Sequence, residues 1–127
     1  MNANKILCAG TTPAAQRAMI FRKLTLDAVN RAAQRVVVTA GKNPALAFDG
    51  ENFWRIISPQ IKAVNPIGSG DAFAAAMVSR LLRGDDLGEA CRWGAAAGAA
   101  NALTPMPGEL NRDDVDRLIT GAGVQRI

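Results

Sequence analysis

Apolar residues in the first half of the chain come in short runs of the length typical of β-strands. The clearest run contains three consecutive valines, which indicate a buried strand that ends at Gly41. Asp49-Gly50 is a dipeptide favoured in tight turns, so the runs on either side of it are expected to pair as a hairpin. Ala18–Leu26 fits a strand or a helix equally. The expected strands are KILCA (Lys5–Ala9), QRVVVTAG (Gln34–Gly41), ALAFDG (Ala45–Gly50), NFWRIIS (Asn52–Ser58) and IKAVN (Ile61–Asn65).

Beyond Pro66 the spacing of apolar residues becomes helical. The first helix is apolar on nearly every side, as expected where a sheet covers one face and other helices cover another. The second is rich in Ala and Gly, which allows close approach of backbones. The expected helices are Ser69–Leu82, about Leu87–Leu103, and about Arg112–Thr120 with Asn111 as its cap. Short strands followed by C-terminal helices packed on the sheet predict an α/β fold.

The composition is that of a globular protein, with 49% hydrophobic and 20% charged residues, and one domain is expected over residues 1–127. Trp93–Gly108 is the longest uncharged run, but Gly, Asn and Pro interrupt it, so no membrane span is expected. Cys8 and Cys91 have no CxxC spacing and fit a reducing, cytoplasmic location. The absence of histidine excludes His-based triads and the usual zinc sites.

The net charge of +4 is unevenly distributed along the chain. Residues 1–62 hold nine Lys/Arg against three Asp/Glu, whereas residues 63–127 hold six against eight. A basic first half suits an anionic ligand, either a phosphate compound or a nucleic acid. A solvated surface rich in lysine and arginine explains the same numbers.

The stretch NPIGSGDAFAAAM (Asn65–Met77) places Gly68-Ser69-Gly70 and then Asp71 at the expected start of a helix. Glycines there expose backbone N–H groups at the positive end of the helix, which makes an anion site. A carboxylate beside such a site can orient a hydroxyl and accept its proton, as phosphoryl transfer requires. On these residues alone, an ordinary turn followed by a first-turn Asp that favours the helix dipole remains an alternative.

The same stretch resembles the C-terminal signature of the pfkB (ribokinase-like) carbohydrate kinases. The resemblance continues upstream through VVVTAGKNPALAFDGENFWRIISPQIKAV and downstream through EACRWGAAAGAANALTPMPGEL. The N-terminal segment ILCAGTTPAAQRAMIFRKLTLDAVNRA is similar to the first strand and turn of the sugar-phosphate branch, which includes 1-phosphofructokinases and tagatose-6-phosphate kinases. The resemblance implies a partial ribokinase-like fold that transfers phosphate from ATP, accompanied by Mg²⁺, to a sugar or sugar-phosphate hydroxyl.

The resemblance also assigns roles to individual residues. It implies that Asp71 is the catalytic base and that Gly68, Ser69 and Gly70 form the anion hole. It implies nucleotide contacts at Thr39, Gly41 and Asn101, and weaker substrate contacts at Lys42, Asn43 and Arg31. No dedicated protein site for a metal is expected.

Family members are more than twice as long as this chain. The resemblance therefore implies that the N-terminal part of such a kinase runs directly into its C-terminal part between Val29 and Lys42. Residues 1–35 are therefore expected to be a strand and lid remnant, and residues 36–127 the nucleotide-binding C-terminal portion. The sequence leaves open whether the shortened chain is active or is a deletion product. Loss of the central part would expose apolar surface, so a homo-oligomer is a possible assembly.

The alternative from another class is a non-catalytic module that binds nucleotide or nucleic acid, suggested by the basic first half. Only 5% of the residues are aromatic and the chain has no tyrosine, which makes nucleic acid a poor fit. A small-molecule sugar or sugar phosphate is therefore the expected partner.

Overall fold

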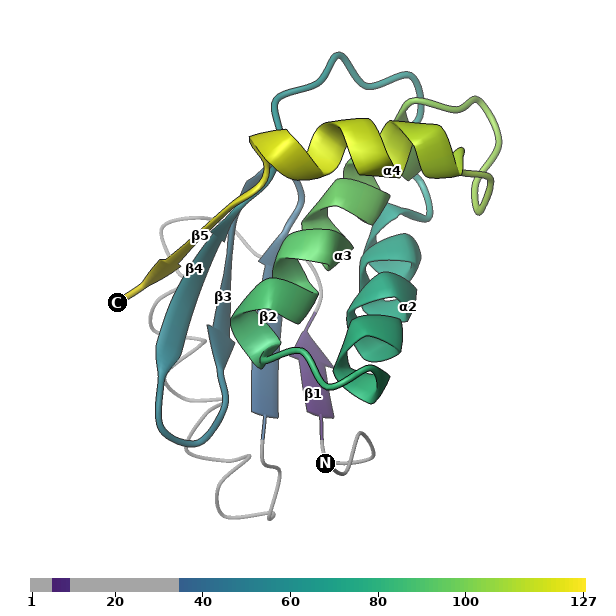
Figure 1. Cartoon of the computed structure of the whole chain (residues 1–127). Coiled ribbons are helices and arrows are strands. Elements are labelled where there is room, and N and C mark those ends of the chain that lie inside the picture. The colour runs from purple at the N-terminus through teal and green to yellow at the C-terminus, as the bar shows by residue number, and fades with distance from the viewer. Residues whose placement is uncertain (1–5, 10–34) are drawn as a thin grey trace.

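The computed structural model describes residues 6–9 and 35–127, which form a sheet with helices packed on one face (Figure 1). The sheet has five strands, and their order in space follows their order in the chain. Strand β1 is parallel to β2, and all other neighbours are antiparallel. The strands are β1 (Ile6–Ala9), β2 (Arg35–Ala40), β3 (Asn43–Phe48), β4 (Phe53–Ile57) and β5 (Gly123–Arg126).

The hairpin of β3 and β4 turns where Asp49-Gly50 predicts it. The carboxylate of Asp49 accepts hydrogen bonds from the backbone N–H groups of Glu51, at 2.9 Å, and Asn52, at 2.7 Å. Gly50 has φ 103°, a left-handed conformation that suits glycine. Phe48 and Phe53 stack across the hairpin with their ring centroids 4.4 Å apart. The hairpin predicted across Asp49-Gly50 is therefore confirmed.

Three helices follow the hairpin: α2 (Ser69–Leu82), α3 (Leu87–Ala102) and α4 (Arg112–Leu118). A short 3₁₀ helix, Ile119–Gly121, continues α4 before β5. The predicted helices are confirmed, with Asp86 capping α3 through the N–H of Glu89 and Asn111 capping α4 through that of Asp113. No helix in the described part of the chain is long and apolar enough to cross a bilayer.

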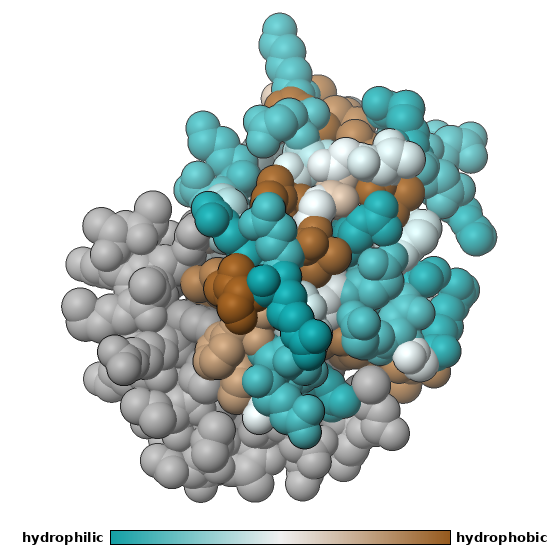
Figure 2. All heavy atoms as spheres, turned by 60° about the vertical axis from the view of Figure 1, so that its left-hand side comes forward, coloured by the Kyte–Doolittle hydropathy of each residue, from teal (hydrophilic) through white to brown (hydrophobic). Residues whose placement is uncertain are grey.

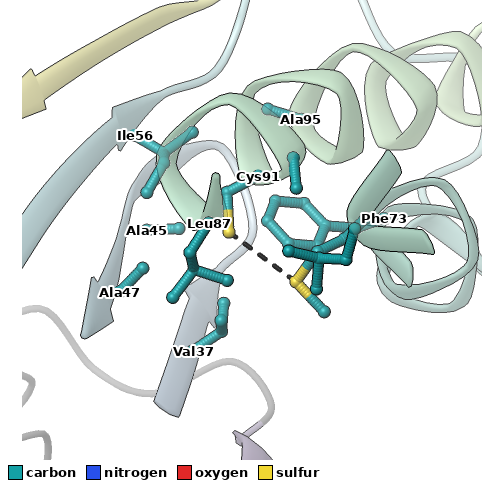
Figure 3. Close-up of a cluster of buried hydrophobic side chains, with 11 residues drawn as sticks. Val37, Ala45, Ala47, Ile56, Phe73, Leu87, Cys91 and Ala95 are labelled. Atoms are coloured by element: carbon teal, nitrogen blue, oxygen red, sulfur yellow. Dashed lines mark hydrogen bonds between the residues drawn. The ribbon is translucent and has the colours of Figure 1, made fainter. Parts of the chain in front are cut away.

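The main core lies between the sheet and the helix pair α2–α3 (Figure 3). In the close-up the side chains of Val37, Ile56 and Leu87 point into the space between the two layers, where Cys91 Sγ lies 3.6 Å from Met77 Sδ. Glycines on α3 bring the two helices close together. A Cβ on Gly98 would lie 3.0 Å from the carbonyl oxygen of Ser69, so only a glycine fits there without a shift.

Two expectations about strands are wrong. Ile61–Asn65 is not a strand: it belongs to an irregular segment, and the N–H groups of Val64 and Asn65 donate to the carbonyl of Ala102 at the end of α3. Conversely, β5 was not expected, because Gly123–Arg126 contains a single apolar residue and becomes a strand through pairing with β4. Ala18–Leu26 lies outside the described residues.

Candidate functional site

The N-terminus of α2 is built by a left-handed residue, Gly68, with φ 85° and ψ −4°. The N–H of Ser69 donates to the carbonyl of Pro66 at 3.1 Å, and the N–H of Ala72 donates to the carbonyl of Gly68 at 3.0 Å. No side chain caps the helix. The N–H groups of Gly70 and Asp71, in the first turn, have no acceptor among the described residues. Two donors at the positive end of a helix are therefore available to an anion.

Asp71 is solvent-exposed in the first turn of α2. In the described part of the chain its carboxylate forms no ion pair, whereas the acids Asp85, Glu89 and Asp114 each pair with an arginine. An exposed, unpaired carboxylate beside open amides is available to a substrate.

A cavity of about 340 Å³ lies against this helix terminus. Its walls come from three parts of the chain that are distant in sequence: the turn between β2 and β3, the segment after β4, and the facing surfaces of α2 and α3. The lining residues are Thr39, Gly41, Lys42, Ser58, Pro59, Gln60, Ile61, Ala63, Pro66, Ser69, Gly70, Phe73, Ala95, Gly98, Ala99 and Ala102.

Five of the ten site residues expected from the sequence line the cavity. Thr39, Gly41 and Lys42 come from the end of β2 and the turn after it, and Ser69 and Gly70 come from the start of α2. The wall that α3 contributes consists of small residues, Ala95, Gly98, Ala99 and Ala102. Their small side chains leave room for a flat, largely apolar group. Such a mixed apolar and amide-lined hollow is the usual form of a small-molecule site.

Four of the expected residues that the structure describes do not line the cavity: Gly68, Asp71, Asn43 and Asn101. Gly68 and Asp71 directly flank the lining residues Ser69 and Gly70 at the start of α2. Asn43 starts β3 and is exposed. Asn101 is fully buried, and its side-chain amide contacts Ile67, Ser69 and Gly108 rather than the cavity. A direct nucleotide contact by Asn101 would require it to leave those partners. Arg31 lies outside the described residues.

Sequence reasoning did not find the wall formed by Ser58–Ala63, which it assigned in part to a strand. A signal was present, since Pro59 and Pro66 cannot donate backbone hydrogen bonds to a neighbouring strand. The segment instead passes over the cavity as irregular backbone.

The sheet covered by two close helices agrees with the ribokinase-like fold that the sequence resemblance implies. The model of the "pfkB family carbohydrate kinase" matches residues 20–113, and the chain belongs to this family.

Curated relatives are sugar-phosphate kinases. The chain is 34% identical over 111 residues to ATP-dependent 6-phosphofructokinase isozyme 2 of Escherichia coli, covering 80% of this chain and 36% of that protein. It is 32% identical over 83 residues to tagatose-6-phosphate kinase of Staphylococcus epidermidis, covering 65% of this chain and 27% of that protein. The chain thus spans about a third of the length of these relatives.

The fold agrees with these matches. The tetrameric inhibited form of phosphofructokinase-2 from Escherichia coli superposes with a TM-score of 0.74 at 25% identity, covering 91% of this chain and 39% of that one. The partial ribokinase-like fold is therefore confirmed.

Proposed function

We propose that this chain carries the nucleotide-binding and hydroxyl-activating part of an ATP-dependent kinase that acts on a sugar phosphate. The observation that carries the proposal is the start of α2, where Ser69 and Gly70 line the cavity and the exposed carboxylate of Asp71 comes directly after them, beside the open amides. The kinase names of the curated relatives support the same chemistry. Within the proposal, residues 36–127 form the nucleotide-binding portion and residues 1–35 an N-terminal strand and lid remnant.

In this mechanism the anion hole is the Gly68-Ser69-Gly70 turn, and the open N–H groups of Gly70 and Asp71 hold the transferring phosphoryl group, because the N–H of Ser69 is already bonded to Pro66. As the acceptor hydroxyl approaches, Asp71 orients it and takes its proton while the oxygen bonds to the γ-phosphorus of ATP. The bond from that phosphorus to the bridging oxygen breaks, and ADP leaves with the electron pair. Helix-terminal amides and a positioned carboxylate provide charge stabilisation and alignment, the two contributions on which phosphoryl transfer depends.

The remaining contacts follow from the walls of the cavity. Thr39 and Gly41 are proposed to contact the nucleotide from the β2–β3 turn, and the exposed Lys42 beside them adds positive charge for a phosphate. Asn43 and Arg31 are weaker proposals for substrate contacts.

Magnesium is proposed to arrive with the nucleotide. Among the described residues no three His, Cys, Asp or Glu side chains gather closely enough to hold a metal ion. Mg²⁺ characteristically keeps several waters and binds through substrate phosphates, where it would neutralise their charge.

The test measures Mg·ATP binding by calorimetry, and then ADP release with fructose 6-phosphate, tagatose 6-phosphate and fructose 1-phosphate. Asp71→Asn is expected to leave Mg·ATP binding within about twofold and to lower turnover by at least about a hundredfold, because the general base is lost. Asp113→Asn is the matched control, since Asp113 is an exposed first-turn acid on another helix, α4.

Each outcome decides between the candidates. Turnover that survives Asp71→Asn contradicts the assigned role of Asp71. Mg·ATP binding without turnover supports a non-catalytic nucleotide-binding module, whereas a salt-sensitive response to an oligonucleotide alone supports a nucleic-acid module.

A further inference from the structure

Asn101, in the last turn of α3, is the one fully buried polar side chain in the described part of the chain. Its Nδ2 donates to the carbonyl oxygen of Ile67 at 2.9 Å and to Oγ of Ser69 at 3.2 Å. Its Oδ1 accepts from the N–H of Gly108 at 2.9 Å. The partners fix the orientation of the amide, because a carbonyl can only accept and a backbone N–H can only donate.

Two of these partners lie on either side of Gly68, the N-cap residue of α2. Ile67 precedes Gly68 and Ser69 follows it, so the amide of Asn101 spans the turn that exposes the helix terminus. A Cβ on Gly68 would lie 3.6 Å from Nδ2 of Asn101. The orientation of the open N–H groups at Gly70 and Asp71 therefore depends on a side chain that does not itself reach the cavity.

The third partner connects this turn to the loop that follows α3. Gly108 belongs to that loop, which is also joined to the turn by a hydrogen bond of 3.0 Å from Asn65 Nδ2 to the carbonyl of Pro105. Within the loop the hydroxyl of Thr104 lies 2.8 to 3.0 Å from three carbonyl oxygens. The two loops form one hydrogen-bonded unit with Asn101 at its centre.

We infer that Asn101 is a positioning residue, which holds the start of α2 so that its free amides point at the transferring phosphoryl group. The inference rests on the proposed function and replaces a direct nucleotide contact by an indirect one. A buried amide whose hydrogen bonds are all satisfied is rigid and costly to disturb, which suits it to this role. Loss of the amide would leave the turn at Gly68 to adopt several orientations.

The test compares Asn101→Ala with Leu118→Ala in the full chain. Leu118 is buried against α3 in a separate apolar cluster, so its variant reports the effect of lost stability alone. Well below both melting temperatures, Asn101→Ala is expected to raise the Kd for Mg·ATP by about tenfold or more, and Leu118→Ala by less than about twofold. Equal effects in the two variants overturn the inference.

A second readout needs no ligand. In amide NMR spectra of the free protein, Asn101→Ala is expected to broaden or shift the signals of Gly70 and Asp71 and to speed exchange of the Gly108 N–H. Gly70 and Asp71 signals that keep their wild-type positions and widths overturn the inference. If the wild-type chain binds no nucleotide, the proposed function fails while these spectra still decide the role of Asn101. Asn101→Ser, whose hydroxyl can keep one bond, is expected to give an intermediate result and serves if the alanine variant does not fold.

Discussion

At the scale of single residues, the site contains two kinds of polar group. Some have no hydrogen-bond partner in the described part of the chain, and others are hydrogen-bonded to the protein itself. The amides of Gly70 and Asp71 and the carboxylate of Asp71 have no described partners. In contrast, the side-chain nitrogen of Asn101 donates two hydrogen bonds and its oxygen accepts one. Binding groups must be free to meet a ligand, and the groups that support them must not be. This division separates residues that would touch a nucleotide from those that would hold the first set in place.

Gly68 offers a direct experiment on that division. Its φ of 85° is unfavourable for alanine, and a Cβ would lie 3.3 Å from the N of Gly108. Gly84 is the matched control, with φ 99° and no atom within 4 Å of the same position. Both alanine variants are expected to lose about 1–2 kcal/mol of unfolding free energy from backbone strain, measured by denaturant titration. Only Gly68→Ala is expected also to weaken Mg·ATP binding; equal binding by both variants would show that the close contact at Gly68 is unimportant.

At the scale of elements, α2 is placed by α3 rather than by the sheet. Small residues on α3 let the backbone of α2 approach closely, at Gly98 beside Ser69 and at Gly94 beside Phe73. Because Ser69 is the first residue of α2, the contact at Gly98 sets the distance between the start of α2 and α3. The contact at Gly94 lies about one turn further along α2, at Phe73.

Gly98→Ala and Gly94→Ala test this arrangement together. Alanine ordinarily stabilises a helix interior by about 1 kcal/mol relative to glycine, so a loss of stability reports the helix contact. Both variants are expected to be destabilised by about 1–3 kcal/mol in thermal or denaturant unfolding, since overpacking forces the helices apart. Gly98→Ala is expected to raise the Kd for Mg·ATP more than Gly94→Ala, whose contact, Phe73, also lines the cavity but lies further from the open amides. An increase of similar size in the two variants would argue against a specific role for the start of α2.

The sequence predicted the bounds of an element well where a local feature, such as a proline, a turn or a cap, ends that element. The bounds of α2 follow from Pro66 and the Gly-Ser-Gly turn, and those of α3 from the cap at Asp86. The prediction failed where conformation depends on a distant partner. Ile61–Asn65 has a strand-like composition but meets the end of α3, and Gly123–Arg126 is extended because β4 lies beside it.

The candidate site shows the same limit. The Gly-Ser-Gly-Asp motif indicated an anion site because helix-terminal amides need no distant residue to form one. The sequence offered no way to know that Ser58–Ala63 forms a wall of the cavity, or that Ile67, 34 residues away, accepts a hydrogen bond from the amide of Asn101, because no local pattern reaches that far along the chain.

At the scale of the whole molecule, apolar side chains remain on the surface in several places. Figure 2 shows a face turned toward the β4–β5 side, on which hydrophilic side chains predominate but apolar ones gather toward the centre. Near the start of α2, Val64 is 64% exposed and Ile67 is 66% exposed. On the hydrogen-bonded loop after α3, Met106 and Leu110 are exposed as well. Apolar groups gathered at one end of a domain favour contact with another protein surface.

Self-association through this end is the expected consequence. Light scattering after gel filtration is expected to give a mass above 13.3 kDa that rises with concentration. The double variant Val64→Ser, Ile67→Ser is expected to shift the distribution toward monomer, because it removes apolar surface that association would bury. Leu82→Ser is the control, since Leu82 is 72% exposed at the opposite end of α2. A chain that stays monomeric at every concentration, or one that Leu82→Ser dissociates equally well, would contradict association through the loops beside the site.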